Sequence, residues 1–546
     1  TLQTSGVVQT SVSNSDKTIT RNFMDGVARY EHKFIDDQLN FSVMAGGSQE
    51  QYRSESFSAS RKDLIDPSLS VINGATGDMS VSGSATEWAM RSFFSRLNLD
   101  WKGKYLAEFN FRGDASSRFA SNKRIGYFPS VSLGWRVSEE DFMGSTKGWL
   151  ENLKLRASYG SLGNNSIGNY DALSTYGISN YVLNKAIAAG LSQKAIANTK
   201  LSWESTYVAN IGIDFSTMRN RLSGTFEFFN KQTKNILIDL PAPAVHGTTK
   251  IPKQNAAQVT NKGVEFSLGW NDKVGRNFTY GVSGNVTYIY NNVDKFRGSY
   301  YAIDGSKLIT EGHPVNVRYV RVVDRIVSTD EDLALVNQML ANAPVIDGVK
   351  QTVFPYGVPA KGDFLYKDVN GDGLVNDNDR VIEGWGSTPK FTYGVNLRCS
   401  YKSIDLSVLL QGTAGIKGYL QDGYFTPNVR WGYQIAKEIA EGAWTPGKAQ
   451  TGDFAYPRQL EYTSTINTQI SDFWLCSQAY LKIRNISLGY TLPKSLTQKA
   501  FISGFRVYGS LENFFTFTKW KGVDPETGNL AYPAMRQATL GVNITF

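Results

Sequence analysis

The sequence predicts an all-β protein, an antiparallel transmembrane β-barrel. Three observations predict it: polar and apolar residues alternate along many segments, short and long connections alternate between these segments, and aromatic residues and glycine are abundant. The chain of 546 residues contains 28 Tyr, 30 Phe, 11 Trp and 51 Gly but only 16 Pro. It contains no apolar run of about 18 residues or more, so the sequence offers no transmembrane helix.

The alternation has a period of two residues, which is the period of a β-strand. It is clearest at the end of the chain, where Ala538, Leu540, Val542, Ile544 and Phe546 alternate with polar residues or glycine. The same pattern occurs at 505–512, 391–398, 264–270, 210–215, 153–159 and 108–112. Soluble sandwiches alternate too. Here, however, the polar face carries charges in many strands and aromatic residues flank the apolar face near the turns, as in a wall between lipid and a wet lumen.

One segment near the end of the chain breaks the alternation. The apolar residues Leu481 and Ile483 are out of phase by one position with Ile486, Leu488 and Tyr490. A β-bulge inserts one extra residue into a strand and produces such a shift. We therefore predict a bulge between residues 483 and 486.

Short and long connections alternate along the chain. Short ones are expected near 34–38, 102–103, 216–220, 272–276 and 402–403, and somewhat longer ones near 139–149 and 493–503. Long ones are expected near 59–85, 161–199, 239–257, 293–389 and 420–477. Outer-membrane barrels have short periplasmic turns and long extracellular loops, so 293–389 and 420–477 are predicted to be extracellular.

If the carboxyl terminus lies in the periplasm, every strand acquires a direction. Counting back from Phe546 gives about 15 strands, or about 17 if 315–328 and 361–368 are also crossings. Both counts are odd, and residues 1–17 then lie outside the cell, whereas a complete single-chain barrel has an even count. We therefore expect residues 1–546 to form the C-terminal part of a larger barrel whose first strands lie upstream. The alternative is an error of one strand in the count.

Charge and motif content argue against two other classes of protein. The net charge is +8, but Lys and Arg are scattered singly, so a nucleic-acid groove is not expected. The three histidines are isolated and no zinc, nucleophile-elbow or P-loop pattern occurs, so the sequence does not predict an enzyme. Cys399 and Cys476 form no redox motif and are interpreted as small apolar residues.

One segment has the ligand spacing of a calcium loop of the EF-hand kind. The candidate ligands are Asp368, Asn370, Asp372, the carbonyl of Leu374, Asn376 and Asp379. The last position is Asp where an EF-hand has a bidentate Glu, and the flanking helices are missing. Ca²⁺ is therefore one interpretation, and the other is a turn rich in Asp, Asn and Gly that is held by local hydrogen bonds. No other cofactor is predicted.

Aromatic residues in the long loops are candidates for stacking on a substrate or docking a lid. The candidates are Trp431, Tyr433, Trp444 and Trp520, with Tyr456 and Trp474 in the same region. Packing inside the loops, or a place in the outer aromatic girdle, is the alternative for each of them.

Several segments resemble the SusC/RagA family of TonB-dependent outer-membrane transporters. They are LKLRASYGSLGNNSIGNY (153–170), LSWESTYVANIGIDF with RLSGTFEFFNKQTKNIL (201–237), NKGVEFSLGW (261–270), FLYKDVNGDGLVNDNDRVIEGWGSTPKFTYGVNL (364–397), IDLSVLLQG (404–412), AYLKIRNISLGYTLPKSL (479–496), FRVYGSLENFFTFTKWKGVDPE (505–526) and ATLGVNITF (538–546). Residues 1–150 fit the barrel pattern but resemble the family less distinctively.

The resemblance implies a barrel of about 22 strands that is closed by an N-terminal plug. It implies a TonB complex that supplies energy, a SusD-like surface lipoprotein as a lid, and import of oligosaccharides or peptides across the outer membrane of a Gram-negative bacterium. The plug, the TonB-contacting segment and the leader are not found in this sequence. Phe546 resembles the signal read by the barrel-assembly machinery.

Three functions remain open from the sequence. The first is TonB-dependent import of a nutrient. The second is a passive porin, or an adhesin whose barrel anchors long loops. The third is a structural SusC-like subunit of a larger outer-membrane assembly. The first needs a plug, whereas the second needs an open lumen.

Overall fold

The structure is a computed structural model, which describes residues 9–240, 253–297, 301–303, 305–384, 386–420, 428–429, 435–461, 464–528 and 534–546. Within these ranges no helix has the length and apolar character needed to cross a membrane. The chain divides into two compact units. Unit 1 comprises 1–139, 156–210 and 231–258, and unit 2 comprises 140–155, 211–230 and 259–546.

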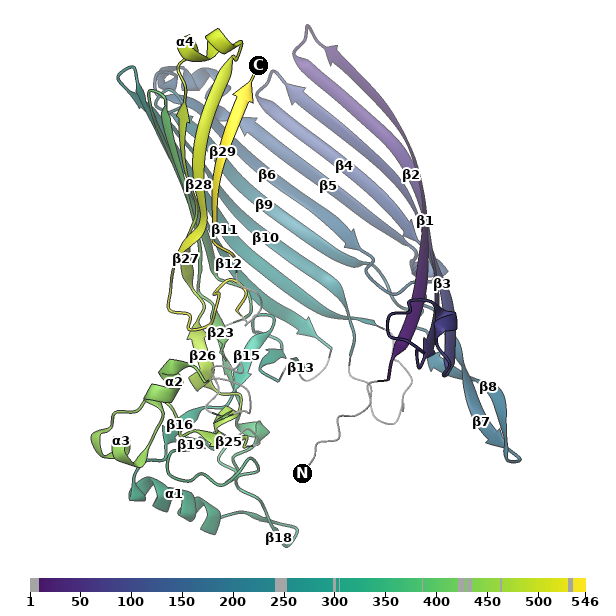
Figure 1. Cartoon of the computed structure of the whole chain (residues 1–546). Helices are drawn as coiled ribbons and strands as arrows, with labels where there is room; N and C mark the ends of the chain where they lie inside the picture. Colours follow the sequence, from purple (N-terminus) through teal and green to yellow (C-terminus); the bar gives the residue numbers. More distant parts are fainter. Residues whose placement is uncertain are drawn as a thin grey trace. The chain divides into compact units, whose positions relative to one another are not determined.

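Fifteen strands form one sheet in which, apart from inserted short strands, neighbours in sequence are neighbours in the sheet (Figure 1). The strands are β1 (Ser11–Phe34), β2 (Leu39–Lys62), β3 (Met79–Trp101), β4 (Tyr105–Ser116), β5 (Ile125–Arg136), β6 (Leu150–Asn164), β9 (Glu204–Thr217), β10 (Leu222–Ile238), β11 (Gln254–Val274), β12 (Phe278–Phe296), β21 (Phe391–Tyr401), β22 (Ile404–Ala414), β27 (Tyr480–Thr491), β28 (Gly504–Thr518) and β29 (Gln537–Thr545). The smaller of the two predicted strand counts is confirmed. The extra crossings considered at 315–328 and 361–368 are wrong, because these segments belong to small separate sheets.

In unit 1, antiparallel pairing places residues of like character in rows across β1–β5. One row is apolar and consists of Tyr30, Val43, Leu97, Phe109 and Val131. The adjacent row, on the other face, consists of Glu31, Ser42, Asn98, Glu108 and Ser132. Since successive residues of a strand point to opposite faces, these five strands have one apolar and one polar face, as the alternation predicts.

Aromatic residues lie at the turn end of the apolar face in unit 1. Trp101 lies opposite Tyr105, which lies opposite Trp135. The rings of Tyr105 and Trp135 stack with centroids 6.5 Å apart. Such a band of aromatic side chains beside short turns is typical of the interfacial girdle of an outer-membrane barrel.

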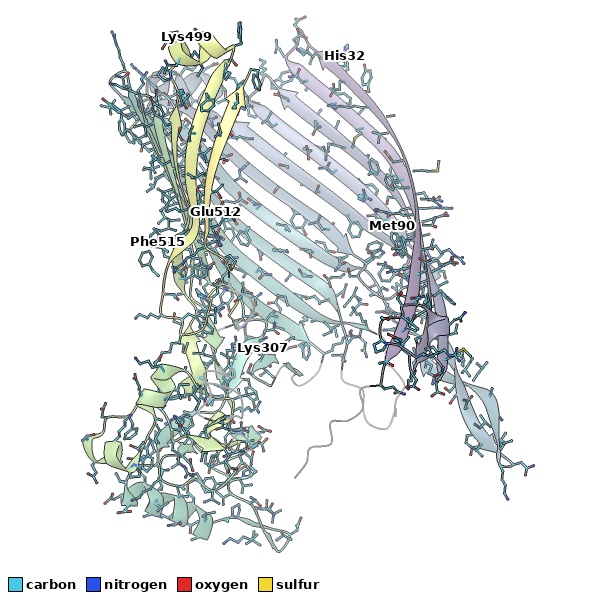
Figure 2. The ribbon with its side chains drawn as sticks, in the orientation of Figure 1. His32, Met90, Lys307, Lys499, Glu512 and Phe515 are labelled. Carbon is cyan, nitrogen blue, oxygen red and sulfur yellow. The ribbon has the colours of Figure 1, made fainter. Side chains whose placement is uncertain are left out.

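Unit 2 repeats the arrangement in its strands; Figure 2 draws the side chains and labels Glu512 and Phe515 of β28. An apolar row consists of Val282, Leu397, Val408, Ile486, Leu511 and Ala538. The adjacent polar row consists of Gly281, Arg398, Ser407, Ser487, Ser510 and Thr539. The last residues of the chain therefore form a two-faced strand, as predicted.

The predicted bulge is confirmed. Leu409 of β22 pairs with Asn485, but the next residue, Leu410, pairs with Ile483. Arg484 is therefore the extra residue on β27, and the register with β28 also shifts between Ile483 and Asn485.

The short connections lie where they are predicted, for example at 35–38 between β1 and β2 and at 402–403 between β21 and β22. The long connection predicted at 59–85 is wrong in extent, because β2 continues to Lys62 and β3 begins at Met79. Both strands continue well beyond the roughly 9–11 residues that a membrane crossing requires. The extended ends are rich in serine, and few apolar residues, such as Phe57 on β2 and Val81 on β3, carry the alternation there.

The connection between β6 and β9 and the long connections of unit 2 contain secondary structure of their own. The connection between β6 and β9 contains a hairpin of β7 (Thr175–Leu183) and β8 (Ala186–Ala195). The connections of unit 2 contain β13 (Tyr301–Ile303), β14 (Lys307–Ile309), β15 (Val317–Val320), β16 (Val323–Ile326), β17 (Val345–Ile346), β18 (Val349–Lys350), β19 (Phe364–Tyr366), β20 (Val381–Glu383), β23 (Lys417–Tyr419), β24 (Asn428–Val429), β25 (Leu460–Glu461) and β26 (Leu475–Ser477). The α-helices are α1 (Asp330–Ala341), α2 (Lys437–Gly442), α3 (Pro446–Thr451) and α4 (Lys494–Thr497).

Two hydrophobic cores form mainly from the connections, and Phe128 of β5 and Leu237 of β10 contribute to the first of them. In unit 1 the core consists of Phe119, Phe128, Ile167, Leu201, Trp203 and Leu237. In unit 2 the core consists of Val327, Val336, Val353, Phe354, Phe364, Leu365, Tyr366, Val375, Ile439, Tyr456 and Trp474. The second core joins the connection that follows β12 to the connection that follows β22. We call this part of unit 2, residues 305–384 with 435–479, the loop lobe.

The assignment of the two faces can be tested with one pair of substitutions. Leu97→Arg places a charge in an apolar row, whereas Asn98→Arg places the same charge in the adjacent polar row. If the apolar rows face lipid, Leu97→Arg lowers the free energy of unfolding in a bilayer by about 2–4 kcal/mol. Asn98→Arg changes it by less than about 0.5 kcal/mol. Denaturant unfolding of the full-length protein in phospholipid vesicles measures both, and equal effects would contradict the assignment.

Candidate functional site

The two connections that form the loop lobe are joined by a buried polar cluster. Asp363 is only 1% exposed, and its carboxylate accepts hydrogen bonds from Arg458 Nε at 2.7 Å and Arg458 Nη2 at 2.8 Å. Asn467 is fully buried and donates to the same carboxylate at 3.0 Å. The carboxylate raises the pKa of Arg458 above its ordinary value. A bidentate pair with a buried carboxylate fixes the position of both segments, because removal of Arg458 would leave the charge of Asp363 buried and uncompensated.

Arg321 makes a second connection inside the lobe. Its side chain is fully buried and donates to Gln469 Oε1 at 3.0 Å and to Tyr356 Oη at 2.9 Å. It also forms an ion pair with Asp377, and its guanidinium lies 4.5 Å from the ring centroid of Tyr356. The lobe is therefore an ordered body within unit 2, although it consists of connections between strands.

The connection between β28 and β29 is attached to β27 by ion pairs. Lys482 Nζ lies 2.8 Å from Asp524 Oδ1 and 3.0 Å from Glu526 Oε2. Arg484, the bulged residue, lies 2.7 Å from Glu526 Oε1. Burial alone would raise the pKa of Asp524, but Lys482 and the backbone N–H of Glu526 hold it below its ordinary value. The hydrogen bond from Arg484 lowers the pKa of Glu526.

A further contact ties this connection to the loop lobe. Lys521 Nζ forms an ion pair with Glu438 and donates to Tyr456 Oη at 2.8 Å, while Tyr456 Oη donates to Glu438 Oε1 at 2.6 Å. The hydrogen bonds from Lys521 and Tyr456 lower the pKa of Glu438. Three long connections of unit 2 are thus held together by charged groups.

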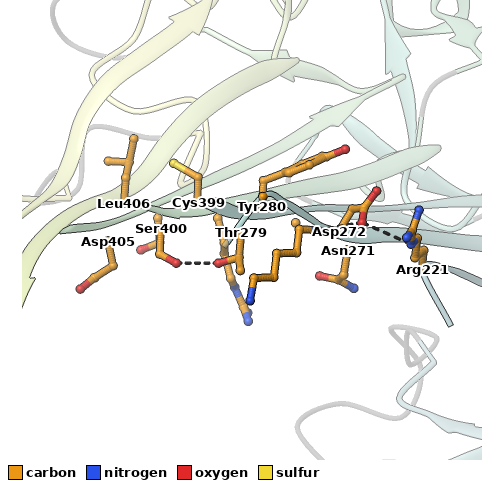
Figure 3. A pocket seen from close by; sticks show the side chains of 14 residues that line it. Arg221, Asn271, Asp272, Thr279, Tyr280, Cys399, Ser400, Asp405 and Leu406 are labelled. Atoms are coloured by element: carbon orange, nitrogen blue, oxygen red, sulfur yellow. Dashed lines mark hydrogen bonds and ion pairs between the residues drawn. The ribbon is translucent and has the colours of Figure 1, made fainter. Parts of the chain in front are cut away.

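A polar cavity of about 790 Å³ lies at the short-turn end of the strands of unit 2 (Figure 3). Two of its lining residues, Arg221 and Asp272, form an ion pair at 3.2 Å, and the hydroxyls of Thr279 and Ser400 are 2.6 Å apart. Asp405 lines the same cavity. These residues come from five neighbouring strands or their turns, and they provide a wall that suits water or a polar surface.

The predicted calcium loop is held by its own hydrogen bonds. The two oxygens of Asp368 accept from the backbone N–H groups of Gly371 and Gly373 at 2.8 Å. Asp379 is fully buried and accepts from the N–H groups of Val369 and Asn376 at 2.8 Å.

Asn370, Asp372 and Asn376 form similar local bonds, and Asp372 accepts from the N–H of Leu374. Among the residues that the structure describes, no three Asp, Glu, His or Cys side chains gather in a way that could hold a metal ion. These bonds, together with the ion pair between Arg321 and Asp377, hold the loop, and Ca²⁺ binding remains a prediction.

The aromatic candidates differ in where they lie. Trp431 and Tyr433 fall outside the described residues. Trp444 and Trp520 are 8% and 6% exposed, and Trp444 Nε1 donates to Ser328 Oγ at 3.2 Å. Packing within the chain accounts for these two rings, and contact with a substrate or lid remains a prediction. Phe546 is 88% exposed at the end of the chain, and its role as an assembly signal also remains a prediction.

Sequence reasoning did not identify the residues that hold the three connections together. In the sequence, Lys482 lies in a predicted strand and resembles the many other charged residues of the polar face. Asp363 belongs to no recognisable motif. The pair Asp524 and Glu526, with one residue between them, follows an aromatic segment in the last connection. Only the fold shows that these carboxylates meet the two cations of β27.

Comparisons with known proteins agree with this architecture. A family model described as TonB dependent receptor-like, beta-barrel, matches residues 2–514. TonB-dependent receptor P3 of Formosa agariphila is 27% identical over 98% of this chain and 52% of its own length. TonB-dependent receptor SusC of Bacteroides thetaiotaomicron is 27% identical over 93% of this chain and 48% of its own length. The chain therefore spans about half the length of the curated relatives it matches.

A solved structure of the RagAB peptide transporter is similar to this chain with a TM-score of 0.80 and 25% sequence identity. The similarity covers 98% of this chain and 56% of that one. Together with the curated SusC relative, it confirms the resemblance to the SusC/RagA family that the sequence segments indicate.

The ion pairs of the last connection predict a dependence on pH. The pKa values of Asp524 and Glu526 are lowered in the folded protein from their ordinary values of 3.8 and 4.5. The two carboxylates therefore contribute fully to stability above these ordinary values. This contribution is lost as the pH falls through the lowered pKa values. A spin label on Val523→Cys, with Cys399 and Cys476 replaced by Ser, should be immobile at pH 7 and pH 5 and should become mobile on further acidification, with a midpoint below the ordinary value of 4.5. Lys482→Met should make the label mobile at every pH. A transition with its midpoint above 4.5 would contradict the prediction.

Calcium binding to the loop at 368–379 is tested by titration. Because the last ligand is Asp, we expect a dissociation constant on the order of 10⁻⁴–10⁻³ M. Calorimetry with CaCl₂ on the full-length protein measures it. Asp372→Ala removes a ligand oxygen and should abolish the signal, whereas Asp347→Ala, in the turn between β17 and β18, should leave it unchanged. Absence of binding up to about 10 mM would leave the hydrogen-bonded turn as the correct interpretation.

Proposed function

The chain belongs to the TonB-dependent receptor-like β-barrel family, and on that premise we propose that it forms the wall and outer loops of a nutrient importer of the SusC/RagA type. It is an outer-membrane protein of a Gram-negative bacterium. The observation that carries the proposal is the two-faced wall. One face suits lipid of the outer membrane and the other suits a water-filled path for a polar solute.

We propose that transport is energised through TonB and gated by a plug. A wall with a continuous polar face would leak if it enclosed an open lumen, so a gated importer of this width needs a second element inside it. The polar cavity at the short-turn end offers charged groups such as Arg221 and Asp272 to such an element. The plug and the first strands of the barrel would come from a segment upstream of this chain.

The loop lobe is proposed to carry a SusD-like lipoprotein lid. A lid that opens and closes over a barrel needs a firm support, and the lobe is held by the buried pairs of Asp363 and Arg321 described above. The long connections would lie on the extracellular side, because they alternate with the short turns. The cargo is proposed to be an oligosaccharide or a peptide. The relative in the RagAB complex is named a peptide transporter.

During biogenesis the chain would be inserted by the barrel-assembly machinery. The exposed Phe546 follows the alternating strand β29 and is the proposed recognition signal. The protein would translocate its cargo without changing it chemically.

Energised uptake distinguishes this proposal from a passive pore. Cells that carry the full-length protein should accumulate a labelled oligosaccharide or peptide mixture, and the accumulation should stop when the proton-motive force is collapsed or TonB is removed. A deletion strain is the baseline. Uptake that persists without proton-motive force would favour a porin, and no difference from the deletion strain would favour a structural or adhesive role. Mass spectrometry of the purified complex should recover a surface lipoprotein.

A further inference from the structure

Lys and Arg residues lie together at the short-turn end of the sheet in unit 2. In the sequence they are scattered singly, but antiparallel pairing brings four connections to one edge of the sheet. These are 218–221 between β9 and β10, 275–277 between β11 and β12, 402–403 between β21 and β22, and 492–503 between β27 and β28. We call them the basic rim. They contain no Asp or Glu, and their cations are Arg219, Arg221, Arg276, Lys402, Lys494 and Lys499, the last of which is labelled in Figure 2.

The positive charge of the basic rim is not balanced by ion pairs. Arg221 alone has a carboxylate partner, Asp272 at the end of β11, at 3.2 Å. The other five cations are exposed, and within the described ranges none of them forms an ion pair. Lys402 lies 5.5 Å from the ring centroid of Tyr401, which is a contact with an aromatic face and leaves the charge uncompensated.

The carboxylates beside the rim do not cancel this charge. Glu151 accepts a hydrogen bond from the backbone N–H of Arg219. Asp405 forms a bidentate pair with Arg506, at 2.9 and 2.6 Å, so the two charges cancel each other. Phe546 follows β29 at the same edge, and its single carboxylate leaves the rim with an excess of positive charge.

The other short connections of the wall are not basic. The turns at 35–38 and 102–104 carry two Asp and two Lys between them. The connection at 137–149 carries Glu139, Glu140 and Asp141 but only one cation, Lys147. The positive charge is therefore a property of the rim and not of short turns in general.

Exposed apolar side chains accompany the cations of the rim. Met218 and Leu496 are 52% and 57% exposed, and Phe501 is 92% exposed. Val274, the last residue of β11, is 60% exposed. Cations beside exposed apolar side chains are typical of a surface that enters the headgroup layer of a bilayer.

The apolar face of the wall reaches the rim. Its last row before the turns consists of Phe278, Tyr401, Ile404, Tyr490 and Val507, each directly opposite the next. Aromatic residues at the edge of an apolar band lie at the level of lipid headgroups. Because Lys402 directly follows Tyr401, the cations of the rim are within the reach of a long side chain from those headgroups.

We propose that the basic rim binds the phosphate groups of anionic phospholipids in the periplasmic leaflet of the outer membrane. Arg and Lys form charge-assisted hydrogen bonds with phosphate, and each such residue near an anionic leaflet is attracted about fivefold. The rim faces the periplasm because its connections are short. Its continuity with the lipid-facing row favours lipid over an acidic protein as the partner. The inference depends on the outer-membrane location of the chain and is independent of the cargo.

A local measurement of lipid identity tests the inference. The full-length protein carries a fluorescent label at Ser495→Cys in α4, with Cys399 and Cys476 replaced by Ser, in phosphatidylcholine vesicles. Phosphatidylglycerol with a spin label near its headgroup should quench the fluorescence at least about threefold more strongly than phosphatidylcholine with the same label, because the anionic lipid collects at the rim. About 1 M NaCl should remove the difference. Equal quenching by the two lipids at low salt would overturn the inference.

A label in another short connection is the reference. Gly144 lies in 137–149, where the structure has open space for a side chain. The carboxylates of that connection predict no preference for phosphatidylglycerol at Gly144→Cys. A preference as strong as that at Ser495→Cys would belong to the whole protein and would refute the rim as the site.

Removal of charge locates the site. Lys402→Gln, Lys494→Gln and Lys499→Gln, combined in one variant, should lower the preference at the label in α4 at least about threefold. The control variant removes the same charge from the long connections, by Lys185→Gln, Lys194→Gln and Lys350→Gln. It should leave the preference unchanged. An unchanged preference in the first variant, or an equal loss in both, would refute the assignment. If the first variant does not fold, the effect of salt on the parent protein decides the question.

A second label tests whether the rim enters the headgroup layer. A fluorescent label at Phe501→Cys should be quenched by phosphatidylcholine that is spin-labelled near its headgroup, whereas a label at Ile346→Cys in β17 should not be quenched. A label at Phe501→Cys that resists quenching would place the rim in water and would overturn the inference.

Discussion

Continuous antiparallel pairing is the constraint on which the wall of this protein depends. Backbone N–H and C=O groups find no water inside a membrane, so a strand can cross only if its neighbours satisfy them along its length. Pairing of this kind also sorts the side chains, because directly opposed residues lie on the same face. Leu97 and Phe109 therefore share the apolar face, and Asn98 and Glu108 share the polar one. A slip of one residue would exchange the two faces of a strand, which is why the register is so strongly specified.

Outside the wall, buried charged groups fix the positions of the chain segments, as pairing between strands does within the wall. Asp363, Arg458 and Asn467 join segments about a hundred residues apart, and Arg321 joins three others. Burying such groups costs free energy that the pairing repays only when the geometry is good, so these contacts contribute little net stability. Their effect is specificity of position. A long connection with one favoured arrangement can support a partner, whereas a hydrophobic cluster alone tolerates several arrangements.

The sequence predicts the wall better than the connections, and the reason is physical. The period of two residues is a local signal, so the strands at 391–398 and 505–512, and even the bulge near 484, could be predicted without knowing any partner. The ends of β2 and β3 could not, because toward Lys62 and Met79 the alternation is carried by only a few apolar residues among many serines, such as Phe57 on β2 and Val81 on β3. The loop lobe was predicted only as a long loop. Its core depends on contacts between distant segments, and Asp363 or Arg321 acquires a role only once those segments meet.

The bulge links the wall to the last connection. If residues are counted back from Ser487 by twos, a regular strand would put Ile483 on the polar face and Lys482 on the apolar face, which is unfavourable for a charged side chain. The extra residue Arg484 shifts the phase, so that Ile483 pairs with Leu410 and Lys482 pairs with Gln411 on the polar side. There Lys482 can reach Asp524 and Glu526, and Arg484 itself bonds to Glu526. A single inserted residue thus keeps the apolar face continuous and provides both cations that fix the last connection. The fixed place of the last connection depends on that insertion, which explains why an irregular strand is useful at this position.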